Sequence, residues 1–287
     1  MKQVASVYHR KVGNILVSAI CDGYLDTSYG IFQGITPQEG EKLMADACLL
    51  SPPRISVNAY LVRCQGRVAL IETGSGNSMG LTLGYLADNI RAAGLALEDI
   101  EKVLLTHMHP DHSNGLTTDE GARIYPNAEI ALHEDEFRHW TSDAEMARVE
   151  LRKQDRYFRA ARKHLQAYKD QLSLFTEGEV FPGVMAMPIA GHTPGHTAYL
   201  IASGNDALMI WGDLVHVPNI QLTRPDVTLD FDSDPQAACT TRKRILDMVA
   251  ADQLLVGGMH LDFPGFGHIS REGAGYRFHP EPWKPLI

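Results

Sequence analysis

The stretch that decides the fold is His107-Met108-His109-Pro110-Asp111-His112, which carries three imidazoles and one carboxylate within six residues. Packing an ordinary hydrophobic core does not require such a density of metal-binding side chains. With 13 histidines in 287 residues, a chance match to the pattern HxHxDH is expected in only about a few chains per thousand. The stretch therefore predicts a metal site.

The preceding residues predict where this site lies. Lys102-Val103-Leu104-Leu105-Thr106 is apolar and β-branched, as a buried strand would be. The histidines then occupy the loop that leaves the carboxyl end of a strand, where open α/β sheets bind their ligands.

Further metal donors are expected downstream. Imidazole and carboxylate suit zinc, iron or manganese, and a catalytic ion needs about three protein ligands and one open position. Four donors in one loop cannot supply two such ions. Three later apolar segments each end in glycine and a donor, namely 184–189 before Gly191-His192, 208–211 before Gly212-Asp213, and 253–256 before Gly257-Gly258-Met259-His260.

The order HxHxDH, GHTxGH, Gly-Asp and late histidine resembles the metallo-β-lactamase superfamily over roughly residues 55–270. The resemblance implies an α/β fold, the four-layer αββα sandwich, in which alternating strands and helices form two facing sheets. We expect one domain over 1–287, with an N-terminal extension (1–50) and a helical insert (134–175) over the metal site.

The same resemblance implies a dinuclear centre of two divalent ions, most simply Zn²⁺, with Mn, Fe or Co as alternatives. Carried over by motif, His107, His109 and His192 hold one ion, Asp111, His112 and His260 hold the other, and Asp213 bridges them. His196, the second histidine of the GHTPGH loop, is expected to pack or orient. His268 is the alternative candidate for the last metal ligand. We favour His260 because it directly follows the end of a predicted strand.

Composition restricts the organisation and the partners. A chain of 287 residues that is 44% hydrophobic can bury one large core, and no Ser/Gly-rich linker divides it. The net charge of −9 (26 minus 35), without a Lys/Arg-dense run, disfavours a nucleic-acid partner. No leader and no apolar run of about 18 residues is seen, so we expect no membrane partner. Four scattered cysteines fit thiols in the cytoplasm.

Local signals place several elements. Residues 14–25 predict one strand, and 57–71 predict two strands joined at Gln65-Gly66. Apolar periodicity predicts helices at about 78–93 and 158–172. Thr36-Pro37-Gln38-Glu39 and Ser142-Asp143-Ala144-Glu145 are capping boxes, the second ahead of the long helix, and Asp234-Pro235 opens a last helix.

Two parts of the chain are expected to shape a substrate pocket. Residues 1–50 would line it or form a homodimer contact. The insert would supply Phe137, Trp140, Tyr157 and Phe158, for which helix packing is the alternative interpretation. His216 and His268 are further pocket candidates.

Differences between this sequence and the patterns of several branches of the superfamily exclude some of the possible functions. A class B1 β-lactamase usually has cysteine where Asp213 stands, and a hydroxyacylglutathione hydrolase has a helical domain after the last ligand, whereas 27 residues (287 minus 260) follow His260. A flavodiiron reductase needs a flavin domain that this chain has no length for. Residues 211–216, 224–227, 231–234 and 260–268 resemble the branch of methyl parathion hydrolase and related lactonases. Glu72-Thr73-Gly74 departs from the usual Asp-Thr-Gly.

This branch implies a small-molecule hydrolase that opens lactones or cleaves aryl esters or organophosphate triesters. A hydroxide shared by the two ions would be the nucleophile, with Asp213 as bridge and Asp111 as a candidate proton carrier. Two alternatives stay open, a di-iron oxidoreductase and a non-catalytic lactone-binding sensor, although all seven ligand positions are intact.

Overall fold

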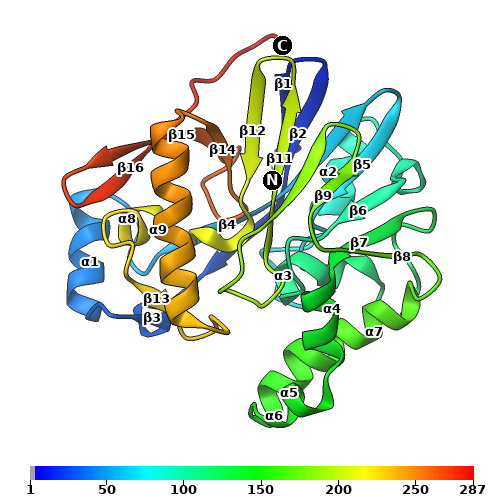
Figure 1. The fold of residues 1–287 in the computed structure, drawn as a ribbon, viewed down its shortest axis with the longest axis horizontal. Coiled ribbons are helices and arrows are strands. Elements are labelled where there is room, and N and C mark those ends of the chain that lie inside the picture. Colours follow the sequence, from blue (N-terminus) through cyan, green and yellow to red (C-terminus); the bar gives the residue numbers. More distant parts are fainter. Residues whose placement is uncertain (1–3) are drawn as a thin grey trace.

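The computed structural model describes residues 4–287 and contains two facing seven-stranded sheets (Figure 1). The first has the order β1 (Val7–Val12), β2 (Ile15–Asp26), β4 (Arg54–Cys64), β5 (Arg67–Ile71), β6 (Lys102–Leu104), β7 (Glu129–His133), β8 (Leu172–Phe175). The second has the order β16 (Gly275–Pro280), β15 (Phe266–Glu272), β14 (Leu255–Gly257), β12 (Asp206–Ile210), β11 (Thr197–Ser203), β10 (Val184–Pro188), β9 (Gly178–Phe181).

The main core lies between the two sheets. Alternate residues of each strand point inward, so Tyr60 and Val62 of β4 meet Tyr199 and Ile201 of β11 in one buried cluster. Residues on the outer faces pack under helices, for example Leu70 beneath α2 (Leu86–Ala92) and Met209 beneath α9 (Pro235–Ala251). The chain is therefore an αββα sandwich, as its sequence predicts.

The front of the chain is part of this core. β1 pairs with β2, β2 pairs with β4, and Val12, Ile15 and Val17 are fully or almost fully buried between the sheets. These two strands of the expected N-terminal extension therefore complete the edge of the first sheet.

The rest of the front segment builds a small module beside the sandwich. Helix α1 (Pro37–Asp46) packs with α8 (Pro218–Gln221), and the short strands β3 (Phe32–Gln33) and β13 (Thr228–Leu229) pair with each other. Its own apolar cluster includes Met44 and Ile220. The Thr36 capping box is confirmed, since Thr36 Oγ1 accepts from Glu39 N at 3.2 Å and Glu39 Oε2 accepts from Thr36 N at 2.8 Å.

The helical insert differs from the prediction. It contains α4 (Glu134–Thr141), α5 (Asp143–Ala147), α6 (Leu151–Lys153), a π-helical turn (Gln154–Arg159) and α7 (Ala160–Ala167). Ser142 caps only the short α5. The expected helix over 158–172 ends at Ala167, because Leu172 instead pairs with Ile130 at the edge of the first sheet. The insert thus ends in a strand.

The helix expected over 78–93 begins only at Leu86. Gly76, Gly80 and Gly84 all have positive φ, which an α-helix does not tolerate, and they hold the preceding residues in a loop. The last helix starts as predicted, with the Asp234 carboxylate accepting from Ala237 N at 2.9 Å.

Four strands aim their carboxyl ends at one place between the sheets. β6 leads into the 107–112 loop, β10 into His192, β12 into Asp213, and β14 into His260. Among residues 4–287, no helix combines the length and apolar character needed to cross a lipid bilayer.

Candidate metal centre

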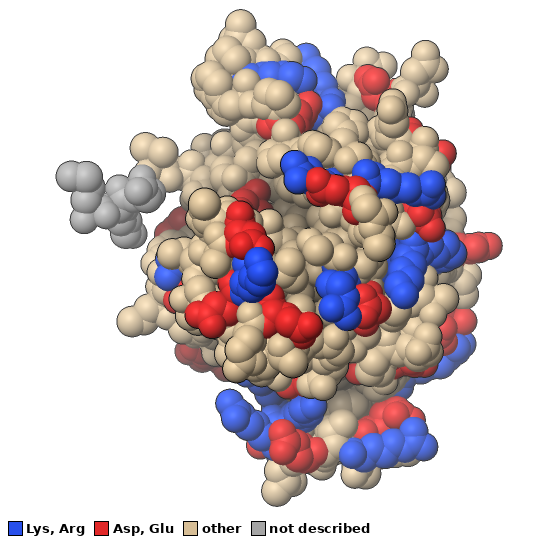
Figure 2. All heavy atoms as spheres, turned by 90° about the vertical axis from the view of Figure 1, so that its left-hand side faces the viewer, with Lys and Arg blue, Asp and Glu red and all other residues tan. Residues whose placement is uncertain are grey.

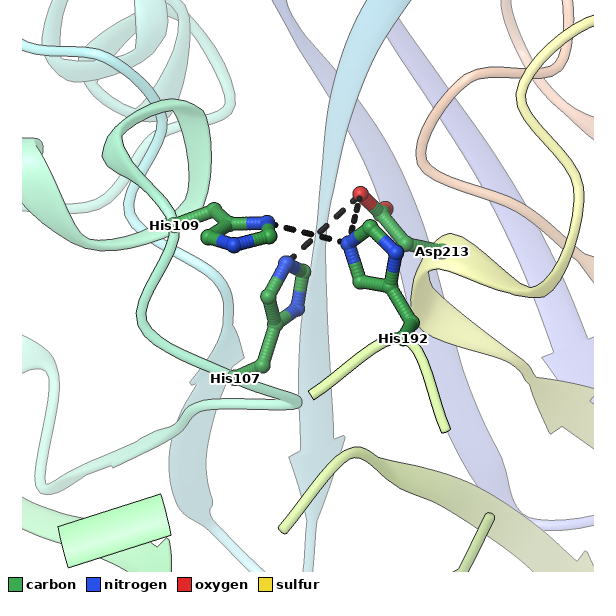
Figure 3. Close-up of side chains that lie close together, drawn as sticks. All are labelled: His107, His109, His192 and Asp213. Carbon is green, nitrogen blue, oxygen red and sulfur yellow. Dashed lines mark hydrogen bonds and ion pairs between the residues drawn. The ribbon is translucent and has the colours of Figure 1, made fainter. Parts of the chain in front are cut away.

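Four donors from three loops form the first cluster, and Figure 3 shows them pointing toward one another. His109 Nδ1 lies 3.0 Å from His192 Nε2. Asp213 Oδ2 lies 3.3 Å from His192 Nε2 and 3.6 Å from His107 Nε2. One ligand atom from each residue falls within 4.8 Å of every other, which is the spacing that one metal ion would need.

A second cluster adjoins the first and consists of Asp111, His112 and His260. Asp111 Oδ2 lies 3.5 Å from both His112 Nε2 and His260 Nε2. Asp213 Oδ1 lies 3.2 Å from the same two nitrogens. Asp213 therefore touches both clusters, as a bridging carboxylate would.

The unpaired atoms of these clusters test whether the residues fit metal. His107 Nε2, His112 Nε2 and Asp213 Oδ1 are buried and have no hydrogen-bond partner. Leaving a buried polar atom unpaired costs about 1–3 kcal/mol. A divalent ion removes this cost, and a mixed imidazole and carboxylate set suits zinc, iron or manganese. The donor set fits divalent metal.

For four of the five imidazoles in the two clusters, the ring nitrogen that faces away from the other donors lies 2.7–3.3 Å from an oxygen. The pairs are His107 Nδ1 with Thr106 Oγ1 at 3.0 Å, His112 Nδ1 with Glu72 Oε2 at 3.3 Å, His192 Nδ1 with Asp232 Oδ1 at 2.7 Å, and His260 Nδ1 with the Ser56 carbonyl at 2.9 Å. Such partners set the tautomer and direction of a metal-binding imidazole.

Glu72 shows what the departure from Asp-Thr-Gly does. Its backbone has a φ of 70°, unusual for a residue other than glycine, and its side chain is buried. Oε1 accepts a hydrogen bond from Thr106 N at 2.7 Å while Oε2 faces His112. The longer side chain thus ties both ends of the 106–112 ligand segment to the end of β5.

His196 orients the bridging residue, in agreement with its expected supporting role. Its Nε2 accepts a hydrogen bond from Asp213 N at 3.0 Å. Burial lowers the pKa of His196 to about 3, so the ring is a neutral acceptor. Gly212 is required at this contact, because a Cβ there would lie 2.4 Å from His196 Nε2.

Charge in the metal-free cluster is distributed unevenly. Burial lowers the pKa of His107 and of His109 well below the usual value. Burial also opposes protonation of His192, but hydrogen bonds to Asp213 and Asp232 outweigh it and raise its pKa to about 9. Burial alone would raise the pKa of Asp111, yet His112 and His260 hold it below its usual range. A bound cation would take the place of the protons that now balance these carboxylates.

The four aromatic pocket candidates separate into two groups. Trp140 and Phe158 are buried and pack against each other, and Trp140 Nε1 donates to Glu136 Oε1 at 2.6 Å, so both serve helix packing. Phe137 packs against the same apolar cluster. Tyr157 is half-buried, and its ring centre lies 5.2 Å from that of His109.

The two histidine candidates lie in different places. His268 is exposed on β15, with Nδ1 3.1 Å from the Gln253 carbonyl, so its prediction as a pocket residue is wrong. The 262–265 loop and the first residues of β15 separate it from His260, and it is not among the residues that line the cavity. His216 lies beside the metal centre, with Nε2 2.9 Å from Asp213 Oδ2, and it forms a third group of possible metal donors with Asp213 and His260.

A cavity of about 920 Å³ adjoins His216 and His260. Its wall comes from α1 with the segment after it, α8, β16 and the 262–265 loop. It mixes apolar side chains, such as Leu43, Met44, Leu50, Val217 and Phe263, with charged ones, such as Asp46, Arg54 and Asp262. Figure 2 looks onto the side of the molecule that carries α1, and acidic and basic side chains are interspersed there.

Sequence analysis missed three contributors to the site. Asp232 orients His192, the Ser56 carbonyl holds His260, and Phe231 stacks its edge near His109, His192 and His216 at 5.4–6.1 Å between ring centres. Phe231 and Asp232 lie in a stretch that the branch resemblance had singled out. A backbone carbonyl such as that of Ser56 leaves no signal in a sequence.

The family model described as Metallo-beta-lactamase superfamily matches residues 52–260. The chain belongs to this superfamily. The matched region contains all seven donors, from His107 to His260. The front strands β1 and β2 precede it, although they are built into the first sheet of this metallo-β-lactamase-fold protein.

Solved structures and a curated relative extend the comparison. One similar solved structure is the crystal structure of the hydrolase AbOPH, of the beta lactamase superfamily. It is 30% identical in sequence with a TM-score of 0.92, and the match covers 99% of this chain and 100% of AbOPH. The structure of AidC, a dizinc quorum-quenching lactonase in complex with the product N-hexanoyl-L-homoserine, is 24% identical in sequence and shares the fold. Its TM-score is 0.93, and the match covers 99% of this chain and 100% of AidC.

The curated relative is the uncharacterized protein YobT of Bacillus subtilis (strain 168). It is 30% identical over 150 residues, which are 52% of this chain and 58% of YobT. The match thus spans little more than half of that relative's length.

Proposed function

We propose that this metallo-β-lactamase-fold protein is a dinuclear hydrolase that opens lactones or cleaves aryl esters or organophosphate triesters. The observation that carries the proposal is the shared carboxylate, since Asp213 lies within 3.6 Å of ligand nitrogens in both donor clusters. Two ions are expected, because seven donors are more than one ion with an open position can use.

Two bound divalent ions, most simply Zn²⁺, would supply a hydroxide at neutral pH and polarise the C=O or P=O bond of the substrate. The chain's own residues hold this arrangement in place. Asp232, Glu72, Thr106 and Ser56 fix the imidazoles, so that the ligands need little rearrangement when metal binds.

Asp111 is the candidate proton carrier. Its side chain is 13% exposed, compared with 1–3% for His112, His192, His260 and Asp213. Oδ2 faces the two histidines of its cluster, which leaves Oδ1 as the oxygen that a departing group can reach. Because the neighbouring histidines hold the pKa of Asp111 low, its carboxylate would first accept the proton of the hydroxide that has added to the substrate and then pass it from Oδ1 to the leaving alkoxide.

Lactones with an apolar substituent are the favoured substrate class. The cavity of about 920 Å³ has room for an acyl chain along the apolar side chains of α1. The product complex of AidC, with N-hexanoyl-L-homoserine, supports the same class. The resemblance of residues 211–216 and 231–234 to methyl parathion hydrolase supports aryl esters and phosphotriesters as the competing class.

A hydrolysis screen with metal-reconstituted enzyme tests the proposal. We expect close to two ions per chain and a higher kcat/KM for an aromatic or acyl-homoserine lactone than for a β-lactam or a glutathione thioester. If a β-lactam or a thioester is the best substrate, the branch assignment is wrong.

The same preparation separates the other candidate functions. A di-iron oxidoreductase would contain iron and absorb visible light, and a lactone sensor would bind N-hexanoyl-L-homoserine lactone without turnover. The cytoplasmic location, the homodimer and the lack of a nucleic-acid partner stay predictions.

A further inference from the structure

Glu136 is a buried glutamate of the helical insert whose two side-chain oxygens accept three N–H groups. The residue lies fully buried on α4, and Oε1 accepts hydrogen bonds from Met108 N at 2.9 Å and from Trp140 Nε1 at 2.6 Å. Oε2 accepts a third hydrogen bond from Gly195 N at 3.0 Å. Glutamate is almost never fully buried unless its oxygens are paired, so these three donors indicate what the residue does.

Two of the three donors belong to the loops that carry the first donor cluster. Met108 lies between His107 and His109, and Gly195 lies three residues after His192. One side chain therefore connects the backbones of both loops. The same two loops bring His109 Nδ1 within 3.0 Å of His192 Nε2 (Figure 3).

The insert approaches the second of these loops very closely. A Cβ at Gly195 would lie 2.3 Å from Glu136 N and 2.6 Å from Glu136 Cβ. Glycine is therefore required at this position, as at other places where two backbones come close together. The contact fixes α4 against the loop that carries His192.

His109 is the imidazole that depends most on such support. The other four imidazoles of the two clusters each have an oxygen partner. Among residues 4–287, the ring of His109 forms a hydrogen-bond contact only with His192 Nε2. Trp140 and Tyr157 of the insert lie beside it, with ring centres 5.7 and 5.2 Å away. The direction of His109 thus depends on its backbone and on the insert, and Glu136 holds both.

Docking of α4 onto the sheet is the alternative role for this residue. The second cluster is held independently of Glu136, since His112 faces Glu72 and His260 faces the Ser56 carbonyl. Loss of a group that orients the first cluster should therefore weaken one ion and spare the other. Loss of a residue needed only for docking would affect both ions or neither.

We propose that Glu136 is a positioning residue that holds His109 and His192 at the separation required by the ion of the first cluster. It acts through the amides of Met108 and Gly195 and does not itself touch the metal or the substrate. The helical insert is then a part of the metal centre as well as a cover over it. The proposal rests on the two-ion site of the proposed function.

Glu136→Gln tests this role with little change in volume. The amide keeps one acceptor oxygen but turns an NH₂ group toward an N–H donor, so at least one of the two loops is released. Glu134→Gln is the matched control, because Glu134 lies on the same helix with a side chain 36% exposed beside Arg138. The measurements are Zn²⁺ titration of the full metal-free chain against a chromophoric chelator, and urea unfolding in chelator.

We expect Glu136→Gln to lower the affinity for one ion about 10- to 100-fold and to leave the other within about 2-fold of the wild type, the usual effect of losing a group that orients a metal ligand. His260→Ala removes a ligand of the second cluster and so identifies the site. Adding Glu136→Gln to His260→Ala should weaken the one ion that remains. Glu134→Gln should resemble the wild type in metal affinity and in urea unfolding.

Two results of the titration would overturn the proposal. Wild-type affinity at both sites of Glu136→Gln would make Glu136 a docking residue, and so would an equal loss at both sites together with a lower free energy of unfolding. If the wild type binds two ions but hydrolyses none of the substrates, a loss confined to one ion still supports the role of Glu136, and only the proposed hydrolysis fails.

Hydrogen exchange of the wild type tests the same role without a substitution, and it decides the matter if Glu136→Gln does not fold. The amides of Met108 and Gly195 should exchange equally slowly with and without Zn²⁺, because Glu136 accepts from both in the metal-free chain. Fast exchange in the metal-free chain would show that the ion holds these loops, and it would overturn the proposal.

Discussion

His192 donates a hydrogen bond from Nδ1 to Asp232 Oδ1 at 2.7 Å, across 40 positions of sequence. This bond leaves the lone pair of Nε2 free to face the metal cluster. Asp232→Asn replaces the acceptor by an amide that can donate to Nδ1, which would place the proton on Nε2. We expect metal affinity to fall about 10- to 100-fold, measured by competition with a chelator.

The control for this prediction is Asp230→Asn in the same loop, where the side chain is exposed. It removes one negative charge but no contact with an imidazole. Equal metal affinities of the two variants would show that Asp232 does not orient His192.

Asp213→Ala should lose metal and activity together. Asp213 is the residue that lies against both donor clusters, so its removal weakens both sites rather than one. Metal analysis after dialysis and a lactone assay check the prediction. A fully metallated and active Asp213→Ala variant would remove the bridging assignment.

His260→Ala and His268→Ala should differ in metal content. His260 is buried beside Asp111 and Asp213, whereas His268 is exposed on β15. We expect His260→Ala to drop toward one ion per chain and His268→Ala to keep the wild-type content and kcat. The reverse pattern would give the ligand role to His268.

The metal donors were predictable from sequence because each follows a strand end, and strand ends converge in an α/β fold. The partners that orient them were not. Asp232 and Ser56 reach His192 and His260 only through the tertiary fold. A short motif shows which metal donors a loop carries, but not which distant oxygen will form a hydrogen bond with each donor.

The predicted secondary structure was wrong where tertiary contacts decide whether a segment forms a helix or a strand. Leu172 fits a helical repeat, yet pairing with β7 satisfies its backbone at the sheet edge. The aromatic Trp140 and Phe158 suited a pocket equally well by composition. In the structure both side chains are buried in the apolar cluster against the first sheet, where they pack the helices.

Arg242→Met should destabilise the fold. Arg242 is 2% exposed and donates to the carbonyls of Leu214, Pro225 and Val227 at 2.7–3.1 Å, which ties the segment after Asp213 to α9. Methionine fills the volume but leaves these buried oxygens unpaired. We expect the free energy of unfolding in urea to fall by about 3 kcal/mol or more, and Arg244→Met, on the exposed side of α9, to change it little.

His164 should make stability depend on pH. It is buried between Thr117 and Asn114, and burial, with a smaller effect of Lys163, lowers its pKa from 6.5 to about 4. Above pH 6.5 the ring is neutral in both states. As the pH falls from 6.5 toward 4, the unfolded chain takes up a proton that the folded chain refuses, so stability is lost over this window and no further below it.

Between pH 7.5 and pH 5, this one residue should lower the free energy of unfolding by about 2 kcal/mol. The measurement is urea unfolding of the wild type and of His164→Gln at both pH values, in chelator so that metal binding does not contribute. His164→Gln should be less stable at pH 7.5, where its hydrogen bonds are disturbed, but should lose about 2 kcal/mol less on acidification. His268→Gln, on the exposed face of β15, should follow the wild type. An equal acid-induced loss in the wild type and in His164→Gln would show that the buried ring is protonated in the folded chain.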